Sequence, residues 1–271
     1  MKHAWPLLAL GLLLGSSREA AAAEPRSVDD YFREANVALD AGATNEAIDL
    51  YELMADNGLK HPDASFNRAV AYVRRAESKQ ARPGDLGRAA AALSETLLLR
   101  PDDEAAADAL RLVREEIGRR RAREGAQQVS VSPSLARSAV AILAEDTWAI
   151  LAGLGSAMLA TGLALRLWWQ RPTTRLTGGV LALLGGCLLA VCGAFAWGAR
   201  HFRTTSRAAV VVASEARLLD ETGKPKAIRG ANAVVEGESV YVVDERGVLA
   251  KIEWGTTEGY VNRSQLMLLG R

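Results

Sequence analysis

Residues 148–199 place the strongest limit on what this chain can fold into. They contain only three charged residues, Arg166, Arg171 and Arg175. The runs on either side, Trp148–Leu165 and Leu176–Ala199, hold 18 and 24 residues without a charge. Helices of that length reach across the roughly 30 Å of hydrocarbon in a bilayer, and neither run has the polar stripe of a half-buried helix. We therefore expect transmembrane helices at 147–169 and 176–199, joined by a loop at 170–175.

Small residues recur at every fourth position of the second apolar run and predict a helix-packing face. The set is Gly178, Ala182, Gly186, Ala190, Ala194 and Gly198. Such faces let helix backbones approach closely in lipid. We expect the face to pack against the first apolar helix in a hairpin. A partner's transmembrane helix is one alternative, and chance recurrence in a glycine- and alanine-rich run is another.

The N-terminus predicts the orientation of this hairpin. Residues 1–23 begin with a basic pair, continue through an apolar stretch and end in four alanines, which is typical of a secretory signal peptide. An uncleaved N-terminal anchor is the alternative, and it would export the next part of the chain as well. Arginines at the two ends of the hairpin are nearly equal in number, so the positive-inside rule does not decide the orientation. Export of the N-terminal part predicts a two-pass protein of the bacterial inner (cytoplasmic) membrane with both soluble parts on the periplasmic side. Inverted topology would make it a cytoplasmic adaptor.

Residues 27–127 show paired helical patterns. Apolar residues at helical spacing follow Ser27, Gly42, Pro62 and Gly84, and the last run ends at Pro101. This predicts a helix-turn-helix unit used twice, with residues 102–123 as a capping helix. A generic helical bundle is the alternative. Residues 128–146 have no strong period and predict a linker.

The two units resemble tetratricopeptide repeats, whose period is about 34 residues. Matches to that family are Gly42, Ala47 and Tyr51 in the first unit and Ala69, Tyr72, Ala89, Leu93 and Pro101 in the second. Residues 75–84 depart from the family by lengthening the second turn. The resemblance implies peptide docking in a groove lined by the first helix of each unit. Candidate groove residues are Arg33, Asn36, Asn67 and Arg74, although each fits a solvated helix position equally well.

From residue 208 the pattern changes to short β-type runs separated by glycines. Residues 236–242, 247–252 and 257–261 resemble the bacterial SH3 pattern, with Tyr260 where that family commonly has tryptophan. A small all-β SH3-like barrel at 208–271 is therefore expected. The resemblance implies binding of peptides or cell-wall material through exposed aromatic residues. Candidate contacts are Tyr241, Trp254 and Tyr260, of which at least two fit a core position better.

Residues able to carry out chemistry are scarce. Of three histidines, His61 and His201 are isolated from any metal-ligand spacing, and both cysteines, Cys187 and Cys192, lie inside the second apolar run. We therefore expect no catalytic site, no cofactor and no metal. The total of 33 Lys+Arg against 32 Asp+Glu gives no reason to expect a nucleic acid. The basic run at 119–123 is flanked by glutamates and fits a solvated helix end.

The expected fold is thus multidomain, with tetratricopeptide-type helical repeats, a transmembrane hairpin and a small SH3-like barrel. This order resembles the BatE proteins of bacterial aerotolerance (Bat) operons, over nearly the whole chain and by architecture alone. The resemblance implies a non-catalytic inner-membrane scaffold in a complex with von Willebrand A-domain Bat proteins and a MoxR-type ATPase. The alternative is a membrane-anchored protein that binds peptidoglycan or senses the envelope through the SH3-like part.

Overall fold

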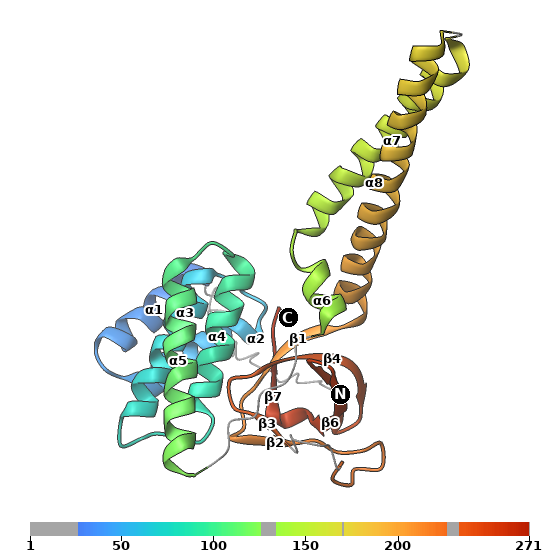
Figure 1. The fold of residues 1–271 in the computed structure, drawn as a ribbon. Coiled ribbons are helices and arrows are strands. Elements are labelled where there is room, and N and C mark those ends of the chain that lie inside the picture. Colours follow the sequence, from blue (N-terminus) through green and yellow to red (C-terminus); the bar gives the residue numbers. More distant parts are fainter. Residues whose placement is uncertain (1–26, 126–133, 170, 227–232, 271) are drawn as a thin grey trace, which may run out of the picture.

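The computed structural model describes residues 27–125, 134–169, 171–226 and 233–270. These residues are mostly helical, with a small antiparallel sheet and two long apolar helices (Figure 1). Three parts succeed one another along the chain: a helical module (27–125), a hairpin (145–205) and a β module (207–270). The predicted signal peptide at 1–23 lies outside the described residues.

Five consecutive helices build the helical module. They are α1 (Val28–Asp40), α2 (Thr44–Asp56), α3 (Pro62–Glu77), α4 (Asp85–Leu99) and α5 (Glu104–Arg123). Ser27 and Asp30 form a capping box that starts α1, and Pro62 occupies the first turn of α3, where its missing N–H costs nothing. Each helix packs on the next, and α4 also packs on strands of the β module. The helix α4 is therefore the centre of the soluble part.

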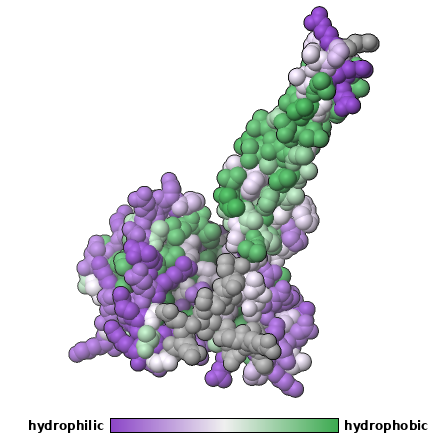
Figure 2. Space-filling view, viewed as in Figure 1, coloured by the Kyte–Doolittle hydropathy of each residue, from purple (hydrophilic) through white to green (hydrophobic). Residues whose placement is uncertain are grey.

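The hairpin consists of α7 (Glu145–Trp168) and α8 (Pro172–Thr205), with the short helix α6 (Leu135–Val140) at its base. Both long helices are long and apolar enough to cross a membrane. Figure 2 shows a continuous apolar surface along the hairpin, with hydrophilic residues at its tip. The helix α8 begins before the predicted span and runs past its end. Likewise α6 lies inside the predicted linker 128–146 and packs on α8.

The two long helices pack through glycines spaced seven residues apart. A methyl group on Gly162 would meet Gly178 O at 2.6 Å, and one on Gly185 would meet Gly155 O at 2.7 Å. Cys192 continues this seam and is buried. The prediction of a packing face with a four-residue spacing is therefore only partly right. Of its six residues, Gly178 and Ala182 contact α7 directly, whereas Ala190 and Ala194 are exposed.

Helix geometry explains the difference between the two spacings. Each step of four residues turns a helix by about 40° beyond a full rotation, so Ala190 lies about 120° away from Gly178. Seven residues fall only about 20° short of two full turns, so Gly185 stays on the same side as Gly178. A seven-residue period keeps small residues along the whole contact between two helices.

Seven strands form the β module within the residues that the structure describes. They are β1 (Arg207–Val211), β2 (Glu215–Arg217), β3 (Ala233–Val235), β4 (Ser239–Arg246), β5 (Leu249–Trp254), β6 (Thr257–Asn262) and β7 (Leu266–Leu268). A 3-10 turn, Arg263–Gln265, precedes β7. The main antiparallel sheet has the order β6-β5-β4-β1-β7, and β2 pairs with β3. Alternate residues of β5, Ala250, Ile252 and Trp254, are buried, as expected for a strand with one face on a core.

Candidate docking site

Two asparagines predicted as groove residues meet where α1 contacts α3. Asn67 Nδ2 donates to Asn36 Oδ1 at 2.9 Å, and the Tyr51 hydroxyl donates to the same oxygen at 2.5 Å. Burial raises the pKa of Tyr51 to about 12, so its hydroxyl remains a donor at neutral pH. Both asparagines are half-buried. The Asn36–Asn67 amide pair is thus held in one arrangement by a side chain from α2.

The two predicted arginines take different positions. Arg74 Nη1 donates to the carbonyl oxygen of Leu39 at 2.7 Å, which joins α3 to the last turn of α1. Arg33 pairs with Asp30 in its own helix at 2.5 Å, and its side chain is 74% exposed. The structure therefore places Asn36, Asn67 and Arg74 along the contact of α1 with α3, and leaves Arg33 in a solvated pair with a residue of its own helix.

Two partly exposed aromatic residues of α1 and α3 are absent from the predicted groove residues. Phe32 lies one helical turn before Asn36, and Phe66 lies one residue before Asn67. Both pack against the core of the helical module without being fully buried. The four-residue spacing of Phe32 from Asn36 was a usable signal, whereas Phe66, next to Asn67 in sequence, points to a different side of α3. Together these four residues, named here the docking face, combine amides with aromatic surface.

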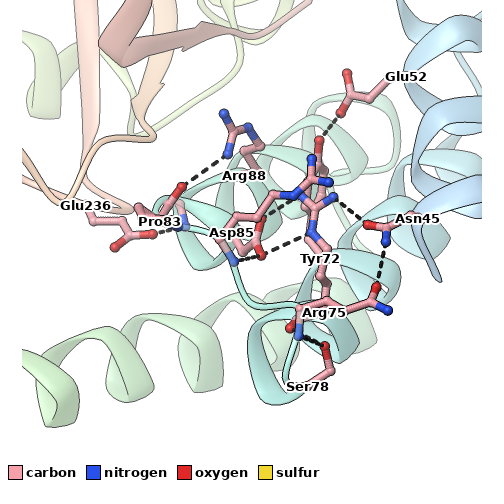
Figure 3. A network of polar contacts seen from close by, with 12 residues as sticks. Asn45, Glu52, Tyr72, Arg75, Ser78, Pro83, Asp85, Arg88 and Glu236 are labelled. Atoms are coloured by element: carbon pink, nitrogen blue, oxygen red, sulfur yellow. Dashed lines mark hydrogen bonds and ion pairs between the residues drawn. The ribbon is translucent and has the colours of Figure 1, made fainter.

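A buried ion pair supports the lengthened second turn. Arg75 Nη2 and Nε contact the Asp85 carboxylate at 2.6 and 3.1 Å, and Arg75 Nη1 donates to Asn45 Oδ1 at 3.1 Å (Figure 3). Asp85 also accepts from the backbone N–H of Arg82. Hydrogen bonding to Asp85 raises the pKa of Arg75. Residues 75–84, which lengthen the second turn relative to the family pattern, therefore form an ordered turn that is held to α2 and α4 by these bonds.

A side chain of the β module accepts a hydrogen bond from the first turn of α4. Gly84 stands at the N-cap of that helix and has no side chain with which to cap it. Instead Glu236 Oε1 accepts from the backbone N–H of Gly87 at 2.7 Å (Figure 3). A methyl group on Gly87 would lie 2.8 Å from both Val211 O and Val212 Cα. Glycine is required for this approach, and the helical and β modules form one packed unit.

Two smaller polar contacts extend this junction to α5. Arg114 Nη2 donates to Ser239 Oγ at 3.0 Å, and Arg121 pairs with Glu215 at 3.6 Å.

Burial raises the pKa of Glu236, because the carboxylate loses water that a single backbone N–H replaces only in part. Glu236 thus helps to hold the modules together and costs free energy when it ionises.

The aromatic residues expected to contact a ligand of the β module are mostly covered. Trp254 and Tyr260 are each 5% exposed. Tyr241 is half-buried, and the guanidinium of Arg137 lies 3.7 Å from its ring centroid. Trp254 alternates with other buried residues of β5, which explains its core position. Tyr241 is therefore the predicted contact that keeps the larger exposed surface.

Arg137 joins the hairpin to the β module. Its guanidinium lies between the rings of Phe202 and Tyr241, 4.5 and 3.7 Å from their centroids. It also donates to Ser206 Oγ at 3.2 Å and pairs with Glu253 at 2.5 Å. Ser206 alone separates α8 from β1. This arginine fixes the angle at which the hairpin leaves the soluble part.

The geometry gives no indication of a metal centre, since no cluster of three or more His, Cys, Asp or Glu among the described residues could hold an ion. Comparison with known proteins adds no further constraint. No protein family, no curated protein and no solved structure matches the chain.

Proposed function

We propose that this chain is a non-catalytic membrane scaffold whose helical module docks a segment of another protein. The hairpin would anchor it, because α7 and α8 have the length and composition of spanning helices. The observation that carries the docking role is the pre-arranged Asn36–Asn67 amide pair, on the same two helices as the partly exposed Phe32 and Phe66. Amides can contact a peptide backbone, while aromatic surface gives buried area to an interface.

Within this class, the order of the modules resembles that of the BatE proteins of aerotolerance operons. We propose that α1–α4 are two tetratricopeptide-type units, that α5 is their cap, and that the β module is SH3-like. The implied partner is then a von Willebrand A-domain Bat protein in the inner membrane. The proposed location has both soluble modules on the periplasmic side.

The arrangement of the modules supports docking at α1 and α3. The β module packs on α4, while α1 lies on the opposite side of the helical module (Figure 1). The hydrogen bonds described above for Asn36, Asn67 and Arg74 all stay within α1–α3. The peptidoglycan-binding alternative has less support, because Trp254 and Tyr260 are buried.

Substitution of Asn67 by alanine in the full chain tests the docking proposal. It removes an amide from the docking face and leaves the bond between Tyr51 and Asn36 in place. Asn57→Ala is the matched control, because it removes the same group at the end of α2. Co-purification of a von Willebrand A-domain partner should fall about tenfold for Asn67→Ala and not for Asn57→Ala. Equal recovery with both variants, or no such partner, contradicts the proposal.

The proposed orientation needs a separate test. A reporter active only in the periplasm, fused after the last residue of the full chain, should be active. A fusion within the loop between α7 and α8 should be inactive. The reverse pattern would place both modules in the cytoplasm and contradict the proposed location.

A further inference from the structure

A cavity of about 560 Å³ lies where the hairpin joins the soluble modules. Its lining includes Arg137 in α6, Phe202 and Arg203 in α8, and Arg207 at the start of β1. Leu98, Leu268 and Leu269 add apolar surface from α4 and the end of the β module. The cavity is thus amphiphilic, since both charged groups and hydrocarbon side chains line it.

The charge of this cavity has one sign. Every charged residue among the described residues lining it is an arginine: Arg137, Arg203 or Arg207. Arg137 is paired with Glu253, and Arg203 with Glu145 at 3.0 Å, but the side chain of Arg203 remains 70% exposed. The described residues give Arg207 no ion-pair partner. Guanidinium groups form paired hydrogen bonds with phosphate oxygens, so the chemistry of the cavity suits a phosphate-bearing anion.

The position of the cavity along α8 indicates where such a phosphate would come from. A span of about 30 Å from Leu176 ends near Ala196 at 1.5 Å per residue. Trp197, 70% exposed, then falls at the interface, where tryptophan is enriched. Arg203 lies about 10 Å beyond the end of the hydrocarbon at Ala196, a few ångströms outside a headgroup layer about 5–8 Å thick. An arginine side chain reaches back over the remaining distance.

We propose that this cavity binds the headgroup phosphate of an anionic phospholipid, with Arg203 and Arg207 as its ligands and Leu268 and Leu269 against the headgroup carbons that lie beyond the phosphate. The inference rests on the proposed membrane anchoring and is independent of the proposed protein docking. The site lies at the junction between the hairpin and the β module, where Arg137 fixes the angle between them. A bound lipid would therefore join the hairpin to the β module at the membrane surface.

Calorimetric titration of the full chain in detergent with short-chain phosphatidylglycerol tests the site. Short-chain phosphatidylcholine and inorganic phosphate are the comparison ligands. Phosphatidylglycerol should bind about tenfold more tightly than either. The variant Arg207→Gln should weaken its binding about threefold to tenfold, and Arg203→Gln with Arg207→Gln should weaken it further. Arg137 stays unchanged, because it holds the junction together.

Arg200→Gln is the matched control, since it removes the same charge from an exposed position of α8 that does not line the cavity. Its affinity should stay within about twofold of the wild type. Equal weakening by Arg200→Gln and Arg207→Gln would show general surface attraction and overturn the proposal. Inorganic phosphate binding as tightly as the lipid would also overturn it, in favour of a free-anion site. Release of the wild-type chain from membranes by alkaline carbonate would instead contradict the anchoring.

Discussion

Replacing Gly87 with alanine adds one methyl group between α4 and the β module. An ideal Cβ at this position would lie 2.8 Å from Val211 O, Val212 Cα and Glu236 Cγ. The first two are backbone atoms of the chain leaving β1, so they cannot move aside as the end of a flexible side chain could. The methyl group must therefore push the two modules apart or shift the start of α4.

Two opposing free-energy terms set the effect of Gly87→Ala on stability. Alanine is favoured over glycine within a helix by about 0.5–1 kcal/mol. Overpacking at a tight contact costs about 1–3 kcal/mol. Gly118 provides the matched control, because it lies inside α5 and an added methyl group would meet nothing within 4 Å. The difference between Gly87→Ala and Gly118→Ala therefore isolates the overpacking cost, about 1–3 kcal/mol.

Amide hydrogen exchange of the full chain measures both variants. Because 1.4 kcal/mol changes an equilibrium constant tenfold, amides at the start of α4 should exchange faster in Gly87→Ala, by up to about thirtyfold. Amides of α5 should exchange more slowly in Gly118→Ala. Slower exchange at α4 in Gly87→Ala, like that at α5 in Gly118→Ala, would refute the inferred contact between the modules.

Three further predictions concern the ion pair, the module junction and the hairpin. Arg75→Met leaves the buried Asp85 carboxylate unpaired and should lower the free energy of unfolding by about 3–5 kcal/mol, whereas adding Asp85→Leu should restore most of it; denaturant unfolding of the full chain measures both. The raised pKa of Glu236 means that the folded state binds its proton more tightly than the unfolded state does, so the stability of the packed junction is greatest below about pH 4.3 and falls as pH rises through the raised pKa. Glu236→Gln keeps an acceptor for the Gly87 N–H and should abolish this dependence in hydrogen exchange; a dependence unchanged in Glu236→Gln would assign it to another group. Gly162→Leu brings a side chain to within 2.4 Å of Ala182 N and should lower the melting temperature of the hairpin in detergent, unlike Gly153→Leu, whose added group enters open space; equal melting temperatures would show that the seam is not the contact.

Local sequence signals were sufficient to predict where most of the helices begin and end. Proline at the first turn of α3 and glycines in the turns mark helix ends through the chain's own geometry, so the breaks could be read directly. The apolar runs of α7 and α8 were equally clear, because length and lack of charge are properties of a single segment. Asn36 and Asn67 were predicted as separate groove candidates, and their hydrogen bond appears only when α1 and α3 are placed together.

The contacts between segments distant in sequence could not be predicted in the same way. Gly87 and Glu236 are 149 positions apart, and neither is unusual in its local sequence. In the hairpin, small residues are so frequent that a four-residue and a seven-residue spacing both fit, and only the partner helix decides between them. The short helix α6 is defined by contacts with α8 and by the bonds of Arg137, so a segment without a strong period could only be predicted as a linker.

Because α8 continues almost directly into β1, a change in the tilt of the hairpin also changes the orientation of the soluble part. The helix α8 has 34 residues, and a single residue, Ser206, separates it from β1. At 1.5 Å per residue it is about 51 Å long, so a tilt of about 10° moves one end by about 9 Å relative to the other. Helix tilt follows bilayer thickness. Under the proposed anchoring and docking, a thicker or thinner membrane would turn the docking face toward or away from the lipid surface and so set the direction from which the proposed partner approaches it.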